Sequence, residues 1–357
     1  MSKTRGDVSN ETSTERITGK AVPGSFLNLT TKEVGIMKLP CHSGRSTWVP
    51  VTRAILAAGA LLLVSAVIAA AAAGATNFCR LASQASVRSC QAGAQSDRWI
   101  AIAKCDNVAN AAERKDCMKQ AQDDLKDALK SCSEQNDARD AVCRQIGGAP
   151  YDPVINPAKF SATINNQYLP LTPGTTFVYE SPTELNEVVV TKNTRQILGA
   201  NCLEVHDTVK LKGSGELTED TLDWFCQDTD GNVWYFGENT KQLAGGLVVG
   251  LEGTWTGGVD GAKPGIAMKA HPAVGDVYRQ EFSPGVAEDI GEVLSLTETV
   301  TVPYNGGTTF TNCVKTRDTT PLDPESLEHK FYCPGIGLVL TIDVNTGVRE
   351  ELVSKTP

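Results

Sequence analysis

The residues best suited to chemistry in this chain are six carboxylic acids between positions 219 and 238. They are Glu219, Asp220, Asp223, Asp228, Asp230 and Glu238. Two carboxyl groups about 5 to 10 Å apart could act as general acid and base on a glycosidic bond. Within the cluster, Asp220, Asp223 and Glu238 are the candidate catalytic residues of a carboxylate-dependent hydrolase with a glycan-type substrate. On a strand, however, Asp220 and Asp223 point to opposite faces, which argues against that pair acting together.

The segment from Asp228 to Asn232 has two interpretations. As a calcium loop of the EF-hand type it lacks both end ligands, because Cys226 would occupy the first position and Gly237 the twelfth. A hairpin turn explains the same residues more simply, since Gly231 can adopt a positive φ. We therefore expect a turn here and no metal site.

Aromatic residues next to these acids fall on both faces of two successive predicted strands. A half-exposed sheet needs only one apolar face, so the second must be covered by the Gly-rich segment that follows or by a ligand. The structural interpretation is core packing. The functional one is a cavity in a curved sheet for an apolar small molecule, with polar groups at its mouth. The candidate ligand-binding residues are Trp224, Trp234, Phe236, Trp255 and Glu238.

Several classes of function are disfavoured. His206, His271 and His329 lack the spacing of a metal site. The chain has neither a G-x-S-x-G motif nor a phosphate-binding glycine loop. The net charge is −9, which argues against a nucleic-acid partner. We expect no cofactor and no metal. A non-catalytic role is favoured over an enzyme: the protein either binds an apolar ligand or acts as a structural or interaction module, whose protein partner the sequence does not identify.

The region that must position these residues starts near position 150, where short alternating runs separated by turn residues predict strands. It contains an internal repeat. Residues 201–208 (NCLEVHDT) match 312–319 (NCVKTRDT), and the flanking strings match in the same order. We expect two copies of one antiparallel β meander, in 150–240 and 272–352, that form a curved sheet or half-barrel.

Within each copy two cysteines flank a predicted turn, which predicts the cross-strand disulfides Cys202–Cys226 and Cys313–Cys333. Between the copies, residues 241–271 are rich in glycine. We expect a connecting loop wrapped over the sheet, or else a flap that faces a ligand.

Residues 77–148 contain no proline and favour helix. Their six cysteines, at 79, 90, 105, 117, 132 and 143, have steps of 11, 15, 12, 15 and 11. Eleven residues of helix rise about 16 Å, so neighbouring cysteines of one helix cannot pair. Facing positions of an antiparallel hairpin have a constant sum of residue numbers. We therefore predict the nested pairs Cys79–Cys143, Cys90–Cys132 and Cys105–Cys117.

The N-terminal region predicts export. Residues 1–53 form a polar, basic tail, and 54–76 form an uncharged stretch that is either a signal peptide or a transmembrane helix. If it is not cleaved, this helix would tether the chain to a membrane, and Met37 is an alternative start. Eleven cysteines also favour an extracytoplasmic location, whether periplasm, cell surface or secreted.

The strings EDTLDWFCQDTDGNVWYFGE (219–238), GVDGAKPGIAM (258–268) and FYCPGIGLV (331–339) resemble a family of uncharacterised exported bacterial proteins. The resemblance covers most of 150–352 and implies an antiparallel β fold with no assigned activity. A second, fold-level resemblance is to the half-barrel sheets of lipoprotein-carrier-like envelope proteins. Together the observations predict an envelope protein with a stapled helical hairpin before a mainly β domain.

Overall fold

The computed structural model describes residues 76–357, which lie within one compact unit. The tail (1–53), the alternative start at Met37 and the hydrophobic stretch that follows lie outside this part. Within it no helix is long and apolar enough to cross a bilayer.

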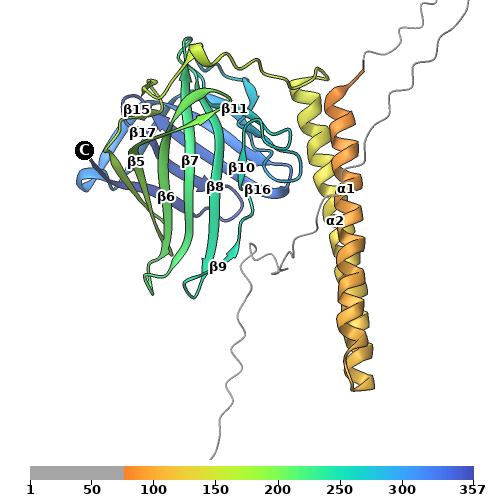
Figure 1. Cartoon of the computed structure of the whole chain (residues 1–357). Coiled ribbons are helices and arrows are strands. Elements are labelled where there is room, and N and C mark those ends of the chain that lie inside the picture. The colour runs from red at the N-terminus through yellow and green to blue at the C-terminus, as the bar shows by residue number, and fades with distance from the viewer. Residues whose placement is uncertain (1–75) are drawn as a thin grey trace, which may run out of the picture. The chain divides into compact units, whose positions relative to one another are not determined.

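The described part begins with two long helices, α1 (Phe78–Asp106) and α2 (Ala111–Ile146), which pack against each other as a hairpin (Figure 1). Asn110 caps α2, because its side-chain oxygen accepts hydrogen bonds from the backbone N–H groups of Ala112 and Glu113 at 2.8 and 3.2 Å. Gly147 follows the last turn with a φ of 84°. Asn77 caps α1 in the same way as Asn110, through the N–H of Arg80.

The hairpin is closed by three disulfides, and the nested pairing is confirmed. The bridges are Cys79–Cys143, Cys90–Cys132 and Cys105–Cys117, with Cα separations of 5.6, 5.8 and 5.5 Å. Few residues of α1 or α2 are buried. The bridges therefore hold together two helices that share little apolar surface.

The rest of the chain is mainly β, with two single-turn helices, η1 (Pro157–Lys159) and η2 (Tyr304–Gly306). The strands are β1 (Phe160–Ser161), β2 (Ile164–Asn165), β3 (Pro170–Leu171), β4 (Thr176–Glu180), β5 (Glu184–Ile197), β6 (Ala200–Leu211), β7 (Leu217–Asp228), β8 (Val233–Ala244), β9 (Leu247–Gly250), β10 (Trp255–Thr256), β11 (Lys263–Met268), β12 (Val277–Arg279), β13 (Glu281–Phe282), β14 (Ile290–Val302), β15 (Thr308–Thr320), β16 (Asp323–Cys333), β17 (Gly337–Asp343) and β18 (Arg349–Thr356).

All but β2 and β3 belong to one antiparallel sheet, whose main path runs β12-β14-β15-β16-β17-β18-β4-β5-β6-β7-β8-β11-β13. The last strand, β18, pairs with the first long one, β4, so the two halves of the chain are joined side by side. The ends of the path, β12 and β13, are separated in sequence by Gln280 alone. This residue brings the edges together, and the sheet is nearly closed, with β5–β8 on one side and β15–β17 behind them (Figure 1).

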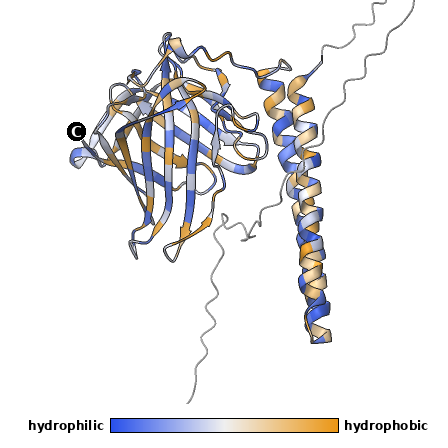
Figure 2. Ribbon diagram, in the orientation of Figure 1, coloured by the Kyte–Doolittle hydropathy of each residue, from blue (hydrophilic) through white to orange (hydrophobic). Residues whose placement is uncertain are grey.

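The long strands alternate between hydrophobic and hydrophilic residues (Figure 2). The largest buried cluster lies inside the sheet and draws on both halves, with Val190, Leu203, Val293, Val339 and Leu352 at no more than 1% exposure. Because side chains alternate along a strand, each strand has one apolar face. The twist and the closure of the sheet turn these apolar faces toward the interior.

The two cross-strand disulfides predicted in the β region are also confirmed. Cys202–Cys226 joins β6 to β7, and Cys313–Cys333 joins β15 to β16, with Cα separations of 4.7 and 4.2 Å. The same order of strands surrounds each bridge; the duplication itself stays a prediction. With five disulfides, this part of the chain is suited to an oxidising, extracytoplasmic environment.

The Gly-rich segment 241–271 differs from the expected connecting loop. Strands β9, β10 and β11 all lie within it, and each pairs with β8. Its glycines permit close backbone approach. A Cβ on Gly265 would lie 2.4 Å from the carbonyl carbon of Gln280. This segment is therefore part of the sheet and its closure.

Candidate functional site

The interior of the sheet contains a cavity of about 360 Å³. Residues of β4–β8 and of β16–β18 face it from opposite sides, and Leu169–Leu171 border it too. Its aromatic and aliphatic walls include Phe177, Tyr179, Val188, Val205, Phe225, Tyr235, Tyr332 and Leu338. Volume and lining are those of a small-molecule site.

The polar lining of the cavity is strongly acidic. Six carboxyl groups line it, from Asp207, Asp223, Glu238, Glu281, Asp289 and Glu350. Lys330 is the single basic side chain among the lining residues. The carboxyl groups come from five strands and one loop, so their convergence depends on closure of the sheet.

At the centre of this acidic lining, Tyr235 lies between two carboxyl groups. Its hydroxyl oxygen is 2.5 Å from Oδ1 of Asp223 and 3.0 Å from Oε2 of Glu238. Simple alternation along β8 would put positions 235 and 238 on opposite faces. A bulge at Phe236 and Gly237 brings both inward, since Gly237 pairs with Trp224 while Tyr235 pairs with Phe225.

The bulge needs a glycine at position 237, whose φ is 150°. A Cβ there would lie 2.7 Å from the carbonyl oxygen of Trp255 on β10, which pairs with β8. Two aromatic rings pack against the ring of Tyr235. Trp255 packs edge-on with ring centroids 5.5 Å apart, and Phe225 stacks on Tyr235 with ring centroids 4.8 Å apart. These contacts fix the tyrosine between the two acids.

This arrangement implies a bound proton. The Tyr235 hydroxyl is directed at both carboxyl groups but has one hydrogen, so a proton on either carboxyl group gives each of the two contacts its own hydrogen. Burial raises the pKa of Asp223 to about 8 and that of Glu238 to about 7, against the opposing effect of the tyrosine hydrogen bond. At neutral pH at least one of the two carboxyl groups is therefore protonated.

The other cavity acids are shifted in the same direction. Burial, together with neighbouring carboxylates, raises the pKa of Asp207, Glu281 and Glu350. Glu281 accepts a hydrogen bond of 2.7 Å from Nε1 of Trp255. Oδ1 of Asp207 is buried and has no hydrogen-bond partner. Asp207 thus presents an unpaired acceptor at the cavity.

Lys330 forms ion pairs with two acids that do not belong to the cavity lining. Burial alone would lower its pKa, but Asp318 and Glu328, 3.4 and 3.3 Å from Nζ, raise it well above the usual value. This ammonium group stays charged, and the two carboxylates beside it balance that charge. Burial also raises the pKa of Asp289, although Lys330 opposes the shift.

The structure places two of the three catalytic candidates in the cavity and the third outside it. Asp223 and Glu238 meet in the cavity, whereas Asp220 lies on the opposite face of β7, as alternation predicts. There its carboxylate pairs with His206 at 2.8 Å and with Lys241 at 3.2 Å. The hydrogen bond from His206 is the main reason that the pKa of Asp220 is lowered.

The predicted hairpin turn is confirmed between β7 and β8. The Asp228 carboxylate accepts hydrogen bonds from the backbone N–H groups of Asp230 and Asn232 and from Nε1 of Trp234, all between 2.8 and 2.9 Å. Gly231 has a φ of 90°. These acids build the turn and lie outside the cavity lining.

Of the predicted ligand-binding residues, Glu238 alone lines the acidic cavity. Trp224 and Phe236 are buried on the outer face of the sheet, with Trp234 packed against them. Phe160, from the segment after the hairpin, covers them, with ring centroids 5.8 and 5.2 Å from those of Trp234 and Phe236. Phe160 thus covers part of this outer face, and Trp234 also lines a separate pocket of about 350 Å³ beside α1.

Comparison with known protein families, curated proteins and solved structures gives no match to this chain. The functional argument therefore rests on the geometry of the site itself.

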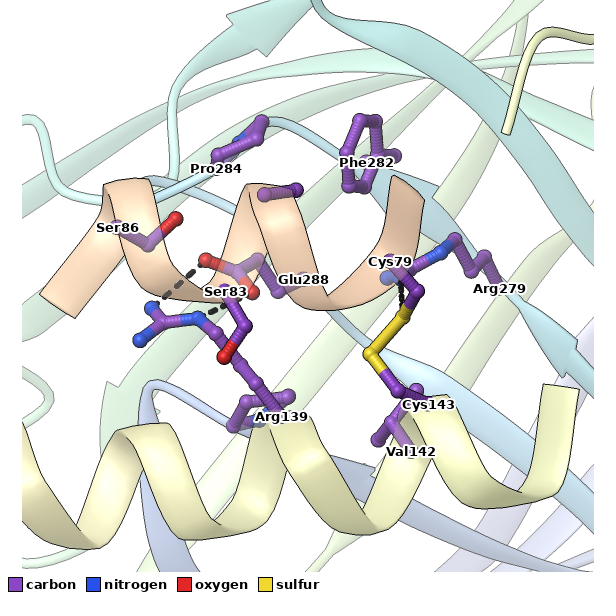
Figure 3. A pocket seen from close by; sticks show the side chains of 12 residues that line it. Cys79, Ser83, Ser86, Arg139, Val142, Cys143, Arg279, Phe282, Pro284 and Glu288 are labelled. Atoms are coloured by element: carbon purple, nitrogen blue, oxygen red, sulfur yellow. Dashed lines mark hydrogen bonds and ion pairs between the residues drawn. A yellow bond between two sulfur atoms is a disulfide. The ribbon is translucent and has the colours of Figure 1, made fainter. Parts of the chain in front are cut away.

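Within the described residues, neither a metal-ligand cluster nor the small pocket beside α1 and α2 gives a further candidate site. Within residues 76–357, no group of three or more His, Cys, Asp or Glu side chains is arranged to hold a metal ion. The pocket in Figure 3 has only about 10 Å³ of free space. Arg139 of α2 occupies that region with two hydrogen bonds of 2.8 Å to Glu288, both side chains being buried. This is a filled structural contact.

Proposed function

We propose that this chain is an exported envelope protein that binds a small molecule in the cavity of its β-sheet. The observation that carries the proposal is a 360 Å³ cavity walled by aromatic and aliphatic side chains. The five disulfides of the described residues support the extracytoplasmic location. In this proposal the segment 54–76 directs export, and tethers the chain to the membrane if it is not cleaved.

The sequence predicts an apolar ligand, but the polar lining of the cavity favours a ligand that also has polar groups. An apolar molecule alone would leave the carboxyl groups desolvated without a partner, which is unfavourable. A molecule with both an apolar body and polar groups satisfies the whole lining. The proposed role remains non-catalytic, which is also the role that the sequence favours.

The test is a thermal-unfolding screen of the full chain against neutral, anionic and cationic small molecules, alongside Val205→Phe. Val205 is 3% exposed and lines the cavity, so phenylalanine reduces the space without adding charge. We expect some compounds to raise the Tm of the parent and not that of the variant. Equal shifts in both proteins, or none in the parent, would refute binding in this cavity.

A second candidate function is a carboxylate-dependent hydrolase. One observation favours it: Asp223 and Glu238 both contact one tyrosine hydroxyl, so the two carboxyl groups lie close together, as the acid and the nucleophile of retaining glycosidases do. Asp220 is not a catalytic residue in this candidate function, because it lies on the other face of β7. Asp223→Asn should abolish the hydrolysis of aryl glycosides if the pair is catalytic, and should leave the binding of a neutral cavity ligand nearly intact if the protein only binds.

A further inference from the structure

We propose that the cavity ligand is an organic ammonium cation with an apolar body. This inference rests on the proposed binding function and specifies its ligand class. It is carried by the charge imbalance of the cavity, by an unpaired buried acceptor and by the aromatic walls.

The charge imbalance is the first step. Six carboxyl groups line the cavity, and the only basic side chain among the lining residues, Lys330, is balanced by Asp318 and Glu328. Burying several carboxyl groups together is unfavourable unless cations or protons neutralise them. Protons can do this in the protein alone, and a bound cation would take over that role.

An independent sign of a missing partner comes from Asp207. Oδ1 of this buried side chain has no hydrogen-bond partner in a protein interior where such atoms are nearly always paired. Asn186, which lines the same cavity, also has an unpartnered Oδ1. Oδ1 of Asn186 is an acceptor, and Oδ1 of Asp207 is an acceptor when its carboxyl group is ionised, so a hydrogen-bond donor can pair with both atoms. An ammonium group is a donor and carries the complementary charge.

The aromatic walls indicate an organic cation rather than a metal ion. Tyr179, Tyr235 and Tyr332 line the cavity with Phe177 and Phe225. The faces of such rings attract ammonium groups, and their surfaces contact hydrocarbon. The carboxyl groups, in contrast, are spread around the wall: in the described part of the chain, no three acidic, His or Cys side chains converge as metal ligands.

Binding should be linked to proton release. The groups that face the Asp223–Tyr235–Glu238 cluster are the other four cavity acids, Glu219 of β7, two further tyrosines and one lysine; the residues of the cavity are Asp207, Glu281, Asp289, Glu350, Tyr179, Tyr332 and Lys330. None of these adds an unbalanced positive charge. A cation near the cluster therefore favours the ionised form of the carboxyl group that shares the tyrosine hydroxyl, and its proton leaves to solvent.

The experiment compares three probes with one phenylethyl body: 2-phenylethylammonium, 2-phenylethanol and 3-phenylpropanoate. Isothermal titration of the full chain at neutral pH should show about tenfold tighter binding of the ammonium than of the alcohol, and the weakest binding for the carboxylate. Titration in two buffers of different ionisation enthalpy should show a proton released with the ammonium and none with the alcohol.

The matched variants lie on two neighbouring strands. Asp223→Asn combined with Glu238→Gln keeps the shape of the site and removes its two central acids, and should reduce the preference for ammonium to about threefold or less. Asp220→Asn changes an acid on the outer face of β7 and should leave the preference unchanged. Circular dichroism and the retained binding of 2-phenylethanol show that the double variant is folded.

The outcomes separate the two proposals. Binding of the alcohol that Val205→Phe abolishes, without preference for the ammonium, would overturn the ligand class and leave the binding function in place. Failure of all three probes to bind would overturn the ammonium proposal. An equal loss of preference in Asp220→Asn would also overturn it, because overall protein charge would then explain the selectivity.

Discussion

The acid at position 223 should lower the stability of the folded protein as the pH rises, and its replacement by asparagine should remove that effect. In the folded chain burial raises the pKa of Asp223 to about 8, whereas the ordinary value is 3.8. Between these values the folded protein holds a proton that the unfolded chain has lost. Stability is therefore highest below the ordinary pKa and falls until the pH passes the folded one.

The size of the effect follows from proton linkage. One such group lowers the free energy of unfolding by about 1.4 kcal/mol per pH unit, or about 2.7 kcal/mol between pH 5 and pH 7. The amide introduced by Asp223→Asn cannot ionise, but it can still accept the hydrogen bond from Tyr235. The stability of Asp223→Asn minus that of the parent should thus become more positive by about 1.4 kcal/mol per pH unit in this range.

Urea unfolding followed by tryptophan fluorescence, with the disulfides intact, measures these free energies at pH 5, 6, 7 and 8. The other titrating groups are common to both proteins, so the difference reports the ionisation of Asp223 together with its coupling to Glu238. Asp276→Asn is the control, because a lowered pKa keeps Asp276 ionised throughout this range and its ion-pair partner is a lysine, Lys269. If the difference between Asp223→Asn and the parent is flat with pH, Asp223 is not held protonated and the shared-proton argument fails.

Two further substitutions test the supports of the fold. Arg139→Met should lower the free energy of unfolding by about 3 to 5 kcal/mol, because Glu288 stays buried without its partner; denaturant titration measures this, and a loss below about 1 kcal/mol would show that the pair is solvated. Gly237→Ala should lower the Tm and weaken cavity binding, since the new Cβ would meet the carbonyl of Trp255. A variant with parental Tm and binding would show that the bulge tolerates a side chain.

Much of the fold follows from short-range rules. The cysteine spacing predicts the hairpin pairing because helix rise forbids bonds within one helix, and the turn at Asp228 follows from its residue types. Alternation along β7 correctly separates Asp220 from Asp223. Each of these arguments uses neighbours in sequence or a single regular element.

The site itself was only partly predictable, for two physical reasons. Tyr235 and Glu238 share a face only because of the bulge, and the signal for it is a glycine after three aromatic residues on a strand. Asp207 and Glu350 reach the cavity only because β18 pairs with β4 and the sheet closes. Pairing between strands so distant in sequence cannot be derived from local patterns.

The nested arrangement of the hairpin cysteines has a consequence for how the chain matures in an oxidising environment. Six cysteines allow 15 pairings, and the native one leaves Cys79, the first to emerge, waiting for Cys143, the last. The bridge nearest the bend, Cys105–Cys117, closes over only 12 residues and has the lowest entropic cost. Oxidation should then proceed outward from the bend, each bridge bringing the next pair together. Trapping the free thiols early should recover this innermost bridge first, and the opposite order would exclude such a sequence of events.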